Sequence, residues 1–358
     1  MNPILANPGH GKPALAKQTR DPGRAARRRT TRQIADTFLP RYRRAIQFAL
    51  TAIRERATLG ELTALAERGR AFLILQAFGL DKPSMTGARP EHAKAEVLFR
   101  QLLERSALEN LEAMPSRLRG LGLLKQDAGL ELGFSFNAVN PQVIEFLRRH
   151  DLAEVRGIDN KTRLGVLAII TKAQTDGLPP AAQARLLKKL VGLTPKQIKM
   201  VANFRTLLEG GEKAAVFRSA LTRALRDHRF DATLISAIES GVKLPSARVD
   251  QMVDRFGERM LAFRANNIAR TETIRAANAG QQLLWRQMAN QGIFARQDVV
   301  RVWIVTPDDR LCPICEPIPG MNPAGVELEQ PFVSPVGDIM HPPVHPQCRC
   351  DTALDTRE

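Results

Sequence analysis

The sequence predicts a mainly α-helical protein: a body of many helices, a small C-terminal α+β module rich in cysteine, and a disordered basic arm at the N-terminus. Three observations support this fold class. Aromatic residues make up only 5% of the 358 residues, while alanine, leucine and arginine are abundant, which favours helices over sheets. Apolar residues recur at three- and four-residue steps over long stretches. All four cysteines and the clearest strand pattern lie within residues 296–358.

Residues 1–32 are expected to be disordered, because prolines and glycines interrupt them and no apolar periodicity is present. The stretch carries eight basic residues against one acid, Asp21. Two interpretations remain open: an arm that binds DNA or an acidic partner, and a solubilising tail without a partner. In the first case, we expect the DNA contacts to come from the arginines of the arm, namely Arg24, Arg27, Arg28, Arg29 and Arg32.

Residues 33–133 are predicted to form a helical N-terminal region. One amphipathic helix is expected as far as Ile53, a second over Leu59–Phe78 and a third over about Glu91–Met114. Glycines then recur between residues 120 and 133, where we expect few contacts to cross and place a domain boundary. The apolar faces of these helices suit either an internal core or a partner surface.

Residues 134–295 are predicted to form a second helical region. Pro141 suits an early helical position, and Thr162 is expected to cap a helix that ends at Ala173. Two further helices flank the turn at Thr194, a pattern that fits either a helix-turn-helix DNA reader or ordinary helix packing. The stretch Ser246–Ala289 contains few helix breakers and predicts one long helix or two in series.

The long basic stretch also contains Arg270 and Glu272, which can serve either as a structural ion pair or in catalysis. A buried structural ion pair that docks this helix on the cysteine module is preferred over a catalytic role, because buried charges are normally paired. The best strand of the chain follows at Val299–Val305, a run of β-branched residues.

Residues 296–358 form the predicted cysteine/histidine module. Cys312 and Cys315 have a two-residue spacer that lets both sulfurs face one point, and a second cluster follows from His345 to Cys350. Two such pairs can complete a tetrahedral structural zinc site. The candidate ligands are Cys312, Cys315, Cys348, Cys350 and His345.

Two other states of the cysteines remain open, namely buried free thiols and disulfides. A catalytic zinc is disfavoured, because no H-x-E partner or H-E-x-x-H helix accompanies the cysteines.

The order of several motifs resembles the phage Mu F-like minor head protein family. In the module these motifs are Trp303, Asp308-Asp309-Arg310, Cys312-Pro-Ile-Cys315, Gly320, Pro342-Pro-Val-His345 and Cys348-Arg-Cys350. The helical lead-in is also similar, and the likeness covers roughly residues 134–351. It rests there on Asn140-Pro141, Gly192-Leu-Thr-Pro-Lys-Gln197, Val201-Ala-Asn-Phe-Arg205, Ala269-Arg-Thr-Glu272, Asn278-Ala-Gly-Gln-Gln282 and Trp285.

The resemblance implies a virion protein of a tailed phage or prophage that acts in head morphogenesis at the portal vertex and is not an enzyme. The implied partners are the portal protein, other head proteins and non-specific double-stranded DNA. The implied location is the head interior or the portal vertex, and the host cytoplasm during assembly.

The charge distribution bears on the DNA partner. The chain carries a net charge of +16, and residues 296–358 hold five bases against ten acids, or −5, so the preceding residues carry +21. Any DNA contact is therefore expected from the helical part, through sequence-independent phosphate contacts. No apolar run is long enough to span a bilayer and no signal core is present, so we expect a soluble, non-exported protein without a membrane partner.

Two competing functions remain. One is a zinc-dependent nuclease or toxin-like enzyme carried on the helices, for which His341, His345, Asp308 and Asp309 would form the site. The other is a host nucleoid-type or RNA-binding protein, which the scarcity of aromatic stacking residues disfavours.

Overall fold

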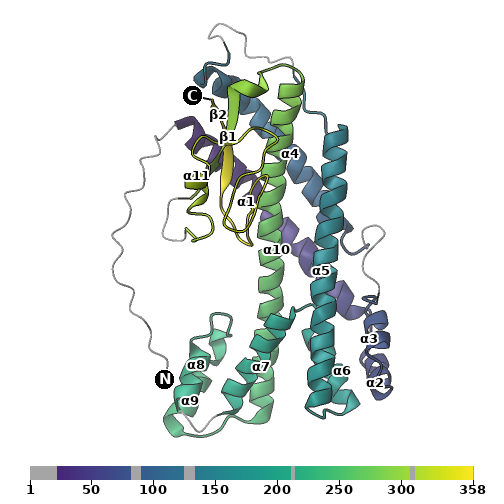
Figure 1. Ribbon diagram of the computed structural model, residues 1–358. Helices are drawn as coiled ribbons and strands as arrows, with labels where there is room; N and C mark the ends of the chain where they lie inside the picture. Colours follow the sequence, from purple (N-terminus) through teal and green to yellow (C-terminus); the bar gives the residue numbers. More distant parts are fainter. Residues whose placement is uncertain (1–21, 82–89, 125–133, 211–213, 307–310, 358) are drawn as a thin grey trace.

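The computed structural model describes residues 22–81, 90–124, 134–210, 214–306 and 311–357, without the side chains of residues 22–30, 151–156 and 214–217. These residues form a mainly helical protein with one two-stranded sheet, as the sequence predicts (Figure 1). The elements in chain order are α1 (Pro22–Glu55), α2 (Leu59–Glu67), α3 (Ala71–Ala77), α4 (Ala93–Gly120), α5 (Pro141–Thr175), α6 (Pro180–Leu190), α7 (Pro195–Glu209), α8 (Ala214–Leu221), η1 (His228–Phe230), α9 (Asp231–Ser240), α10 (Ser246–Asn290), η2 (Arg296–Asp298), β1 (Val299–Ile304), α11 (Ile318–Met321) and β2 (Asp351–Thr356).

The first helix begins earlier than predicted. α1 starts at Pro22, so residues 22–32 of the expected disordered arm are helical, whereas residues 1–21 lie outside the described residues. The fixed backbone angle of proline suits the first turn of a helix, and the alanines and arginines that follow are strong helix formers. The predicted arm is therefore too long at its C-terminal end.

Several helix boundaries also differ from the prediction. The expected helix over Leu59–Phe78 is two helices, because Gly69 adopts a left-handed φ of 61° between them. α4 continues through Pro115, whose neighbour Leu118 is fully buried, so core packing overrides the cost of a proline within the helix. Thr162 is not a cap. It lies inside α5, where its hydroxyl donates to the carbonyl of Ile158 at 2.9 Å.

α10 is one continuous helix that runs along most of the molecule and connects its parts (Figure 1). Three large hydrophobic clusters and one small one, formed by Ala35, Ile274 and Ala277, lie along it. Its first turns, from Val249 to Met260, pack in a core that also receives α2, α3 and α5 to α9. Its middle, from Ala265 to Leu283, packs against α1, α4 and α5. Its last turns, around Trp285, pack against the end of α4 and the two strands.

The middle of α10 approaches α4 closely because its contact face consists of small residues. A Cβ placed on Gly280 would overlap the carbonyl oxygen of Leu103 in α4. One turn along α4, the Ser106 hydroxyl donates to the carbonyl of Ala277 at 2.7 Å. Only glycine permits this backbone approach at position 280.

A buried polar chain ties α4, α10 and β2 together. The Gln281 amide nitrogen donates to Asn110 Oδ1 at 3.2 Å, and the Thr352 hydroxyl donates to Gln281 Oε1 at 3.3 Å. Asn110 Nδ2 in turn donates to the carbonyl of Ser106 at 2.7 Å. Because these buried groups satisfy one another, the chain fixes the relative position of the three elements.

The predicted division between residues 33–133 and residues 134–295 does not separate two cores. α1 and α4 share the cluster at the middle of α10 with α5. Beyond the end of α4, Leu123 and Leu124 pack on the cluster around Trp285 at the end of α10. Helices of the first region are therefore covered by α10 of the second. Of the glycine-rich boundary, residues 125–133 lie outside the described part of the chain.

The C-terminal module is built on the antiparallel pair of β1 and β2, in which Val299 faces Thr356 and Ile304 faces Asp351. Arg301 of β1 is fully buried and organises the loop that follows. Its guanidinium donates to three loop carbonyls and lies 4.9 Å from the centre of the Phe332 ring. The carbonyls belong to Glu327, Gln330 and Met340. Sequence reasoning missed this arginine, because its partners are distant backbone atoms.

Candidate metal centre

The two-stranded ribbon brings the cysteine clusters together. Because Ile304 at the end of β1 pairs with Asp351 at the start of β2, the segment after β1 and the segment before β2 leave the same end of the ribbon. Cys312 and Cys315 lie in the first segment, in a turn where the Cys315 N–H donates to the carbonyl of Cys312 at 3.0 Å. His345 lies in the second segment, with Cys348 and Cys350 just before β2.

The five predicted ligands form one cluster with Cys315 near its middle. Cys312, Cys315 and His345 make one group whose ligand atoms lie within 4.8 Å of one another, and Cys315, Cys348 and Cys350 make a second such group. The Cys315 and Cys348 sulfurs are 3.9 Å apart, close to the roughly 3.8 Å expected for two thiolates on one tetrahedral zinc. The cluster could hold a metal ion, and all four cysteines are free of disulfide bonds.

The His345 ring is oriented for ligation. Its Nε2 lies 3.0 Å from the sulfurs of both Cys312 and Cys315, and its Nδ1 lies 2.8 Å from the carbonyl of Pro346. A hydrogen bond from Nδ1 to a carbonyl leaves the lone pair on Nε2, which is the arrangement that metal-binding histidines use. Pro346, in the turn between His345 and Cys348, therefore provides the carbonyl that orients the His345 ring.

The environment of the sulfurs favours one thiolate in the cluster. Hydrogen bonds from Cys315 and Cys350 lower the pKa of Cys348 to about 2. The hydrogen bond to Cys348 raises the pKa of Cys315, and burial adds to this effect. A thiolate surrounded by further thiols is the form that binds soft metals.

Apolar side chains shield the cluster from water. Cys315, Cys348 and Cys350 are buried in a small core with Ile318 and with the edge-to-face pair of Trp303 and Phe332, whose ring centres are 5.2 Å apart. Cys312 is half-buried at the edge of this core. The shell is thus continuous with the β ribbon, so a metal at this position would tie the loops to the sheet.

The loop from Pro343 to Cys348, which carries two of the candidate ligands, docks directly on α10 through Gln347. Gln347 has a left-handed φ of 63°, and its N–H donates to the Thr271 hydroxyl at 3.2 Å. Its side-chain amide also bonds to the side chain of Asn267. The strained backbone of Gln347 is held by these contacts to the helix.

The predicted ion pair between Arg270 and Glu272 is wrong, although Glu272 is buried as expected. Residues two apart on a helix do not face each other, and Glu272 pairs instead with Arg275, one turn further along α10, at 2.8 Å. Its second oxygen lies 2.9 Å from Nε2 of His150 in α5. Through His150, Glu272 therefore joins α10 to α5 rather than to the cysteine module.

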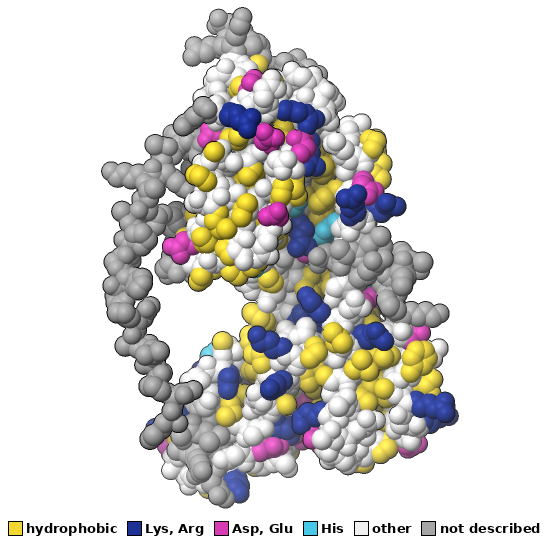
Figure 2. Space-filling model, in the orientation of Figure 1, with side chains coloured by type: hydrophobic (Ala, Val, Ile, Leu, Met, Phe, Trp, Pro, Cys, Tyr) yellow, Lys and Arg dark blue, Asp and Glu magenta, His cyan; other side chains and the backbone are white. Residues whose placement is uncertain are grey.

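The predicted DNA-binding arginines lie at the start of α1. The helical backbone includes Arg24, Arg27, Arg28 and Arg29, but their side chains lie outside the described residues. Arg32 is half-buried and lies 3.6 Å from the carboxylate of Asp36, four residues along the helix. On the face shown in Figure 2, Lys and Arg form several small groups interspersed with acidic residues rather than one continuous basic field.

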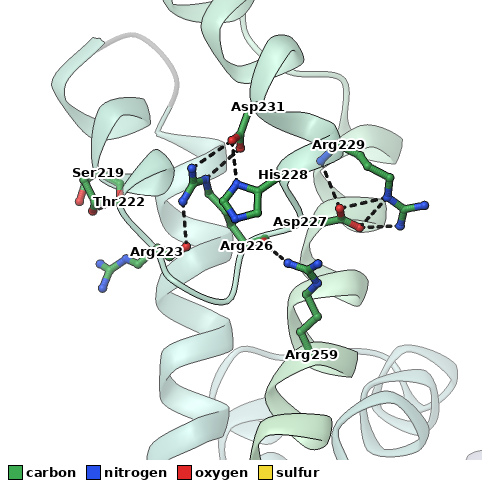
Figure 3. Close-up of polar contacts among 9 residues, drawn as sticks. All are labelled: Ser219, Thr222, Arg223, Arg226, Asp227, His228, Arg229, Asp231 and Arg259. Atoms are coloured by element: carbon green, nitrogen blue, oxygen red, sulfur yellow. Dashed lines mark hydrogen bonds and ion pairs between the residues drawn. The ribbon is translucent and has the colours of Figure 1, made fainter. Parts of the chain in front are cut away.

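A second group of arginines lies in the corner between α8 and α9 (Figure 3). Arg226 makes two bonds to Asp231, at 2.9 and 3.0 Å, and Arg259 of α10 donates to the carbonyl of Arg226. The guanidinium of Arg229 donates hydrogen bonds to the carboxylate of Asp227, and these bonds hold the pKa of that carboxyl well below its ordinary value. Arg226 and Arg229 are thus neutralised by acidic residues of the same corner, so their charges stabilise the connection between α8 and α9 rather than forming an open anion site.

Helices α6 and α7 on either side of the Thr194 turn both pack against α5 and α10; α6 also lies on α2, and α7 also lies on α8. The start of α7 is as predicted: the Thr194 hydroxyl accepts from the Gln197 N–H at 3.3 Å in a capping box.

The fold and the site together define a class: a helical protein with a C-terminal cysteine/histidine cluster suited to a metal ion. Comparison with protein-family models, with curated proteins and with solved structures gave no match. Within the described ranges, none of the helices combines the length and the apolar character that crossing a membrane requires.

Proposed function

We propose that the chain is a minor head protein of a tailed phage or prophage, with a structural zinc in its C-terminal module. The observation that carries this proposal is the group of four cysteines and one histidine, three of the cysteines buried, contributed by two loops at one end of a β ribbon. The motif order that resembles the phage Mu F-like minor head proteins supplies the biological setting.

The donor set favours a structural metal over a catalytic one. Structural zinc sites are filled by four cysteine or histidine ligands, whereas catalytic sites keep a place for water or substrate. Here five soft donors compete for four places, and the apolar shell restricts access by water. His341, required by the enzyme alternative, lies outside both ligand groups, and Asp308 and Asp309 lie outside the described residues.

We assign the four ligands to Cys312, Cys315, His345 and Cys348. The short distances from His345 to the first two sulfurs, and from Cys315 to Cys348, support this set. Cys350 belongs to the group with Cys315 and Cys348 but not to the group with His345; it forms a hydrogen bond with Trp303 and is assigned to the apolar shell.

The helical body offers a surface for assembly with portal protein or another head protein. A cavity of about 740 Å³ lies between α5, α6, α7 and α10, with an apolar floor that includes Ile169, Leu186 and Val253. Ion pairs line its rim, among them Lys189 with Asp254 at 2.6 Å. Such a groove fits the apolar stripe of a partner helix whose flanks carry charges of both signs.

Contact with packaged DNA would be non-specific. The charge of +21 on the residues before the module supports phosphate contacts, and the interspersed acids on the visible face limit their strength. We expect weak binding that falls steeply with salt and ignores sequence.

Metal analysis tests the site. The purified chain should contain about one zinc per molecule. Cys348→Ser should lose the metal, whereas the matched control Cys350→Ser should keep it. Loss of zinc in both variants would contradict the ligand set, and a metal-free wild-type protein would contradict the structural zinc.

Particle analysis tests the biological role. Mass spectrometry of phage or induced prophage particles from cells that carry the gene should detect this chain at low copy number relative to portal protein. Complete absence from particles and from head assembly intermediates would reject the proposed function. Metal-dependent cleavage of plasmid DNA, lost in His345→Ala, would instead favour the enzyme alternative.

A further inference from the structure

A cavity of about 360 Å³, lined by apolar and charged side chains, lies between the helical body and the loop that carries His345. Its walls come from α5, from the start of α7, from the middle of α10 and from the loop Pro343–Pro346. Its volume falls in the range of small-ligand sites in proteins. The side chains that matter for its chemistry are Lys161, Thr194, Arg264, Thr271, Glu272 and Arg275.

Arg264 is a buried cation without an acidic partner. It is only 4% exposed, and its guanidinium donates to the Thr162 hydroxyl at 3.1 Å, to the Ile158 carbonyl at 3.2 Å and to the Gly192 carbonyl. Among the described residues no carboxylate reaches ion-pair distance. Burial lowers the pKa of Arg264 to about 10, and the more distant charge of Asp159 only partly opposes this effect. A charge held this way lacks the compensation that buried ions normally have.

Lys161 supplies a second positive charge at the cavity. Lys161 is exposed beside it and has no ion-pair partner in the part of the chain that the structure describes. The one lining carboxylate, Glu272, is already held by Arg275 and His150. The N-terminus of α7, at Thr194, adds the positive end of a helix dipole. Two cationic side chains, Arg264 and Lys161, thus remain beside the pair of Arg275 and Glu272.

Arg301 shows that this arrangement is not simply how the protein buries an arginine. Arg301 is also enclosed by carbonyls, but it is completely covered and additionally packs on the Phe332 ring. No cavity described here is lined by its guanidinium. Arg264 instead forms part of the wall of a space that a ligand can enter.

We propose that this cavity binds a phosphate group, with Arg264 and Lys161 as its principal partners and the loop that carries His345 as one wall. A phosphate would supply the negative charge that Arg264 lacks, and its oxygens would accept hydrogen bonds from the ammonium group of Lys161. The phosphate could be free anion or the monoester of a nucleotide, because both present the same dianionic group.

Isothermal titration calorimetry on the full-length, metal-loaded protein tests this site. Inorganic phosphate, a nucleoside monophosphate and the corresponding uncharged nucleoside are titrated separately in a phosphate-free buffer. Lys161→Gln removes a cation from the cavity without disturbing the core. Lys199→Gln is the matched control, because Lys199 is exposed on α7 and does not line the cavity.

Saturable binding of phosphate, about ten-fold weaker in Lys161→Gln and unchanged in Lys199→Gln, is the expected result. Tighter binding of the nucleotide than of inorganic phosphate would identify a phosphate monoester, and the reverse order would identify the free anion. The absence of saturable binding by both would overturn the proposal. Equal weakening in the two lysine variants, or nucleoside binding as tight as nucleotide binding, would overturn it as well.

Discussion

Replacing Gly280 with alanine should destabilise the protein, although the same change usually stabilises a helix. In a helix interior, alanine is favoured over glycine by about 1 kcal/mol. At position 280 the new Cβ would overlap the carbonyl oxygen of Leu103, a backbone atom that no side-chain rotation can move away. Overpacking of this kind costs about 1–3 kcal/mol, and a fixed backbone partner places it at the upper end. The net loss is therefore about 2 kcal/mol.

Gly257 on the same helix provides the control. A Cβ at Gly257 would meet its nearest neighbour, Leu190 Cδ2, at 3.6 Å, which is an ordinary contact. Gly257→Ala should therefore stabilise the protein by about 0.5–1 kcal/mol. Urea unfolding of the metal-loaded protein, followed by circular dichroism, measures both changes as shifts of the midpoint. If Gly280→Ala proves as stable as Gly257→Ala, then α4 and α10 do not pack at the distance described.

Three further predictions address other parts of the molecule. Arg301→Met should destabilise the C-terminal module by about 3 kcal/mol or more, because three buried carbonyls lose their hydrogen-bond donor. The control Arg296→Ala breaks only an exposed ion pair and should cost at most about 1 kcal/mol. Differential scanning calorimetry of the two variants compares these losses. Burial lowers the pKa of His341 from 6.5 to about 4, so the unfolded chain binds more protons than the folded chain between pH 4 and pH 6.5. The free energy of unfolding should therefore fall by up to about 3 kcal/mol as the pH drops from 6.5 to 4. Urea unfolding across this pH range should show a smaller loss of stability in His341→Asn than in the wild-type protein. A fragment of residues 134–358 should aggregate or remain partly unfolded, because it exposes the face of α10 that α1 and α4 cover; a monomeric, cooperatively unfolding fragment would show that the shared core is dispensable.

The parts of the fold that depend on local signals could be predicted from sequence. Thr194 followed by Pro195 and Gln197 defines a helix start on its own, and the β-branched run at Val299 defines a strand. The clustering of the cysteines with His345 could also be predicted from the sequence, because metal ligands often occur at short spacings along the chain.

The remaining features depend on contacts between distant segments. Pro115 suggests the end of a helix, but α4 continues because its far end is buried against α10 and the strands. The division at the glycine-rich stretch failed for the same reason, since periodicity shows that a helix has an apolar face and not which helix covers it. The carbonyl partners of Arg264 and Arg301 leave no pattern in the sequence around either arginine.

The position of α10 near the end of the chain has a consequence for synthesis. The residues that α1 and α4 contribute to the middle cluster are complete once Leu103 has been made, but the residues of α10 that complete this cluster begin only at Ala265. About 160 residues must be added in between, which takes roughly 8–30 s at ordinary rates of translation. During that time only α5 and the two helices themselves can cover these apolar surfaces. Co-translational chaperones therefore have a defined interval in which to bind, and it closes when α10 leaves the ribosome.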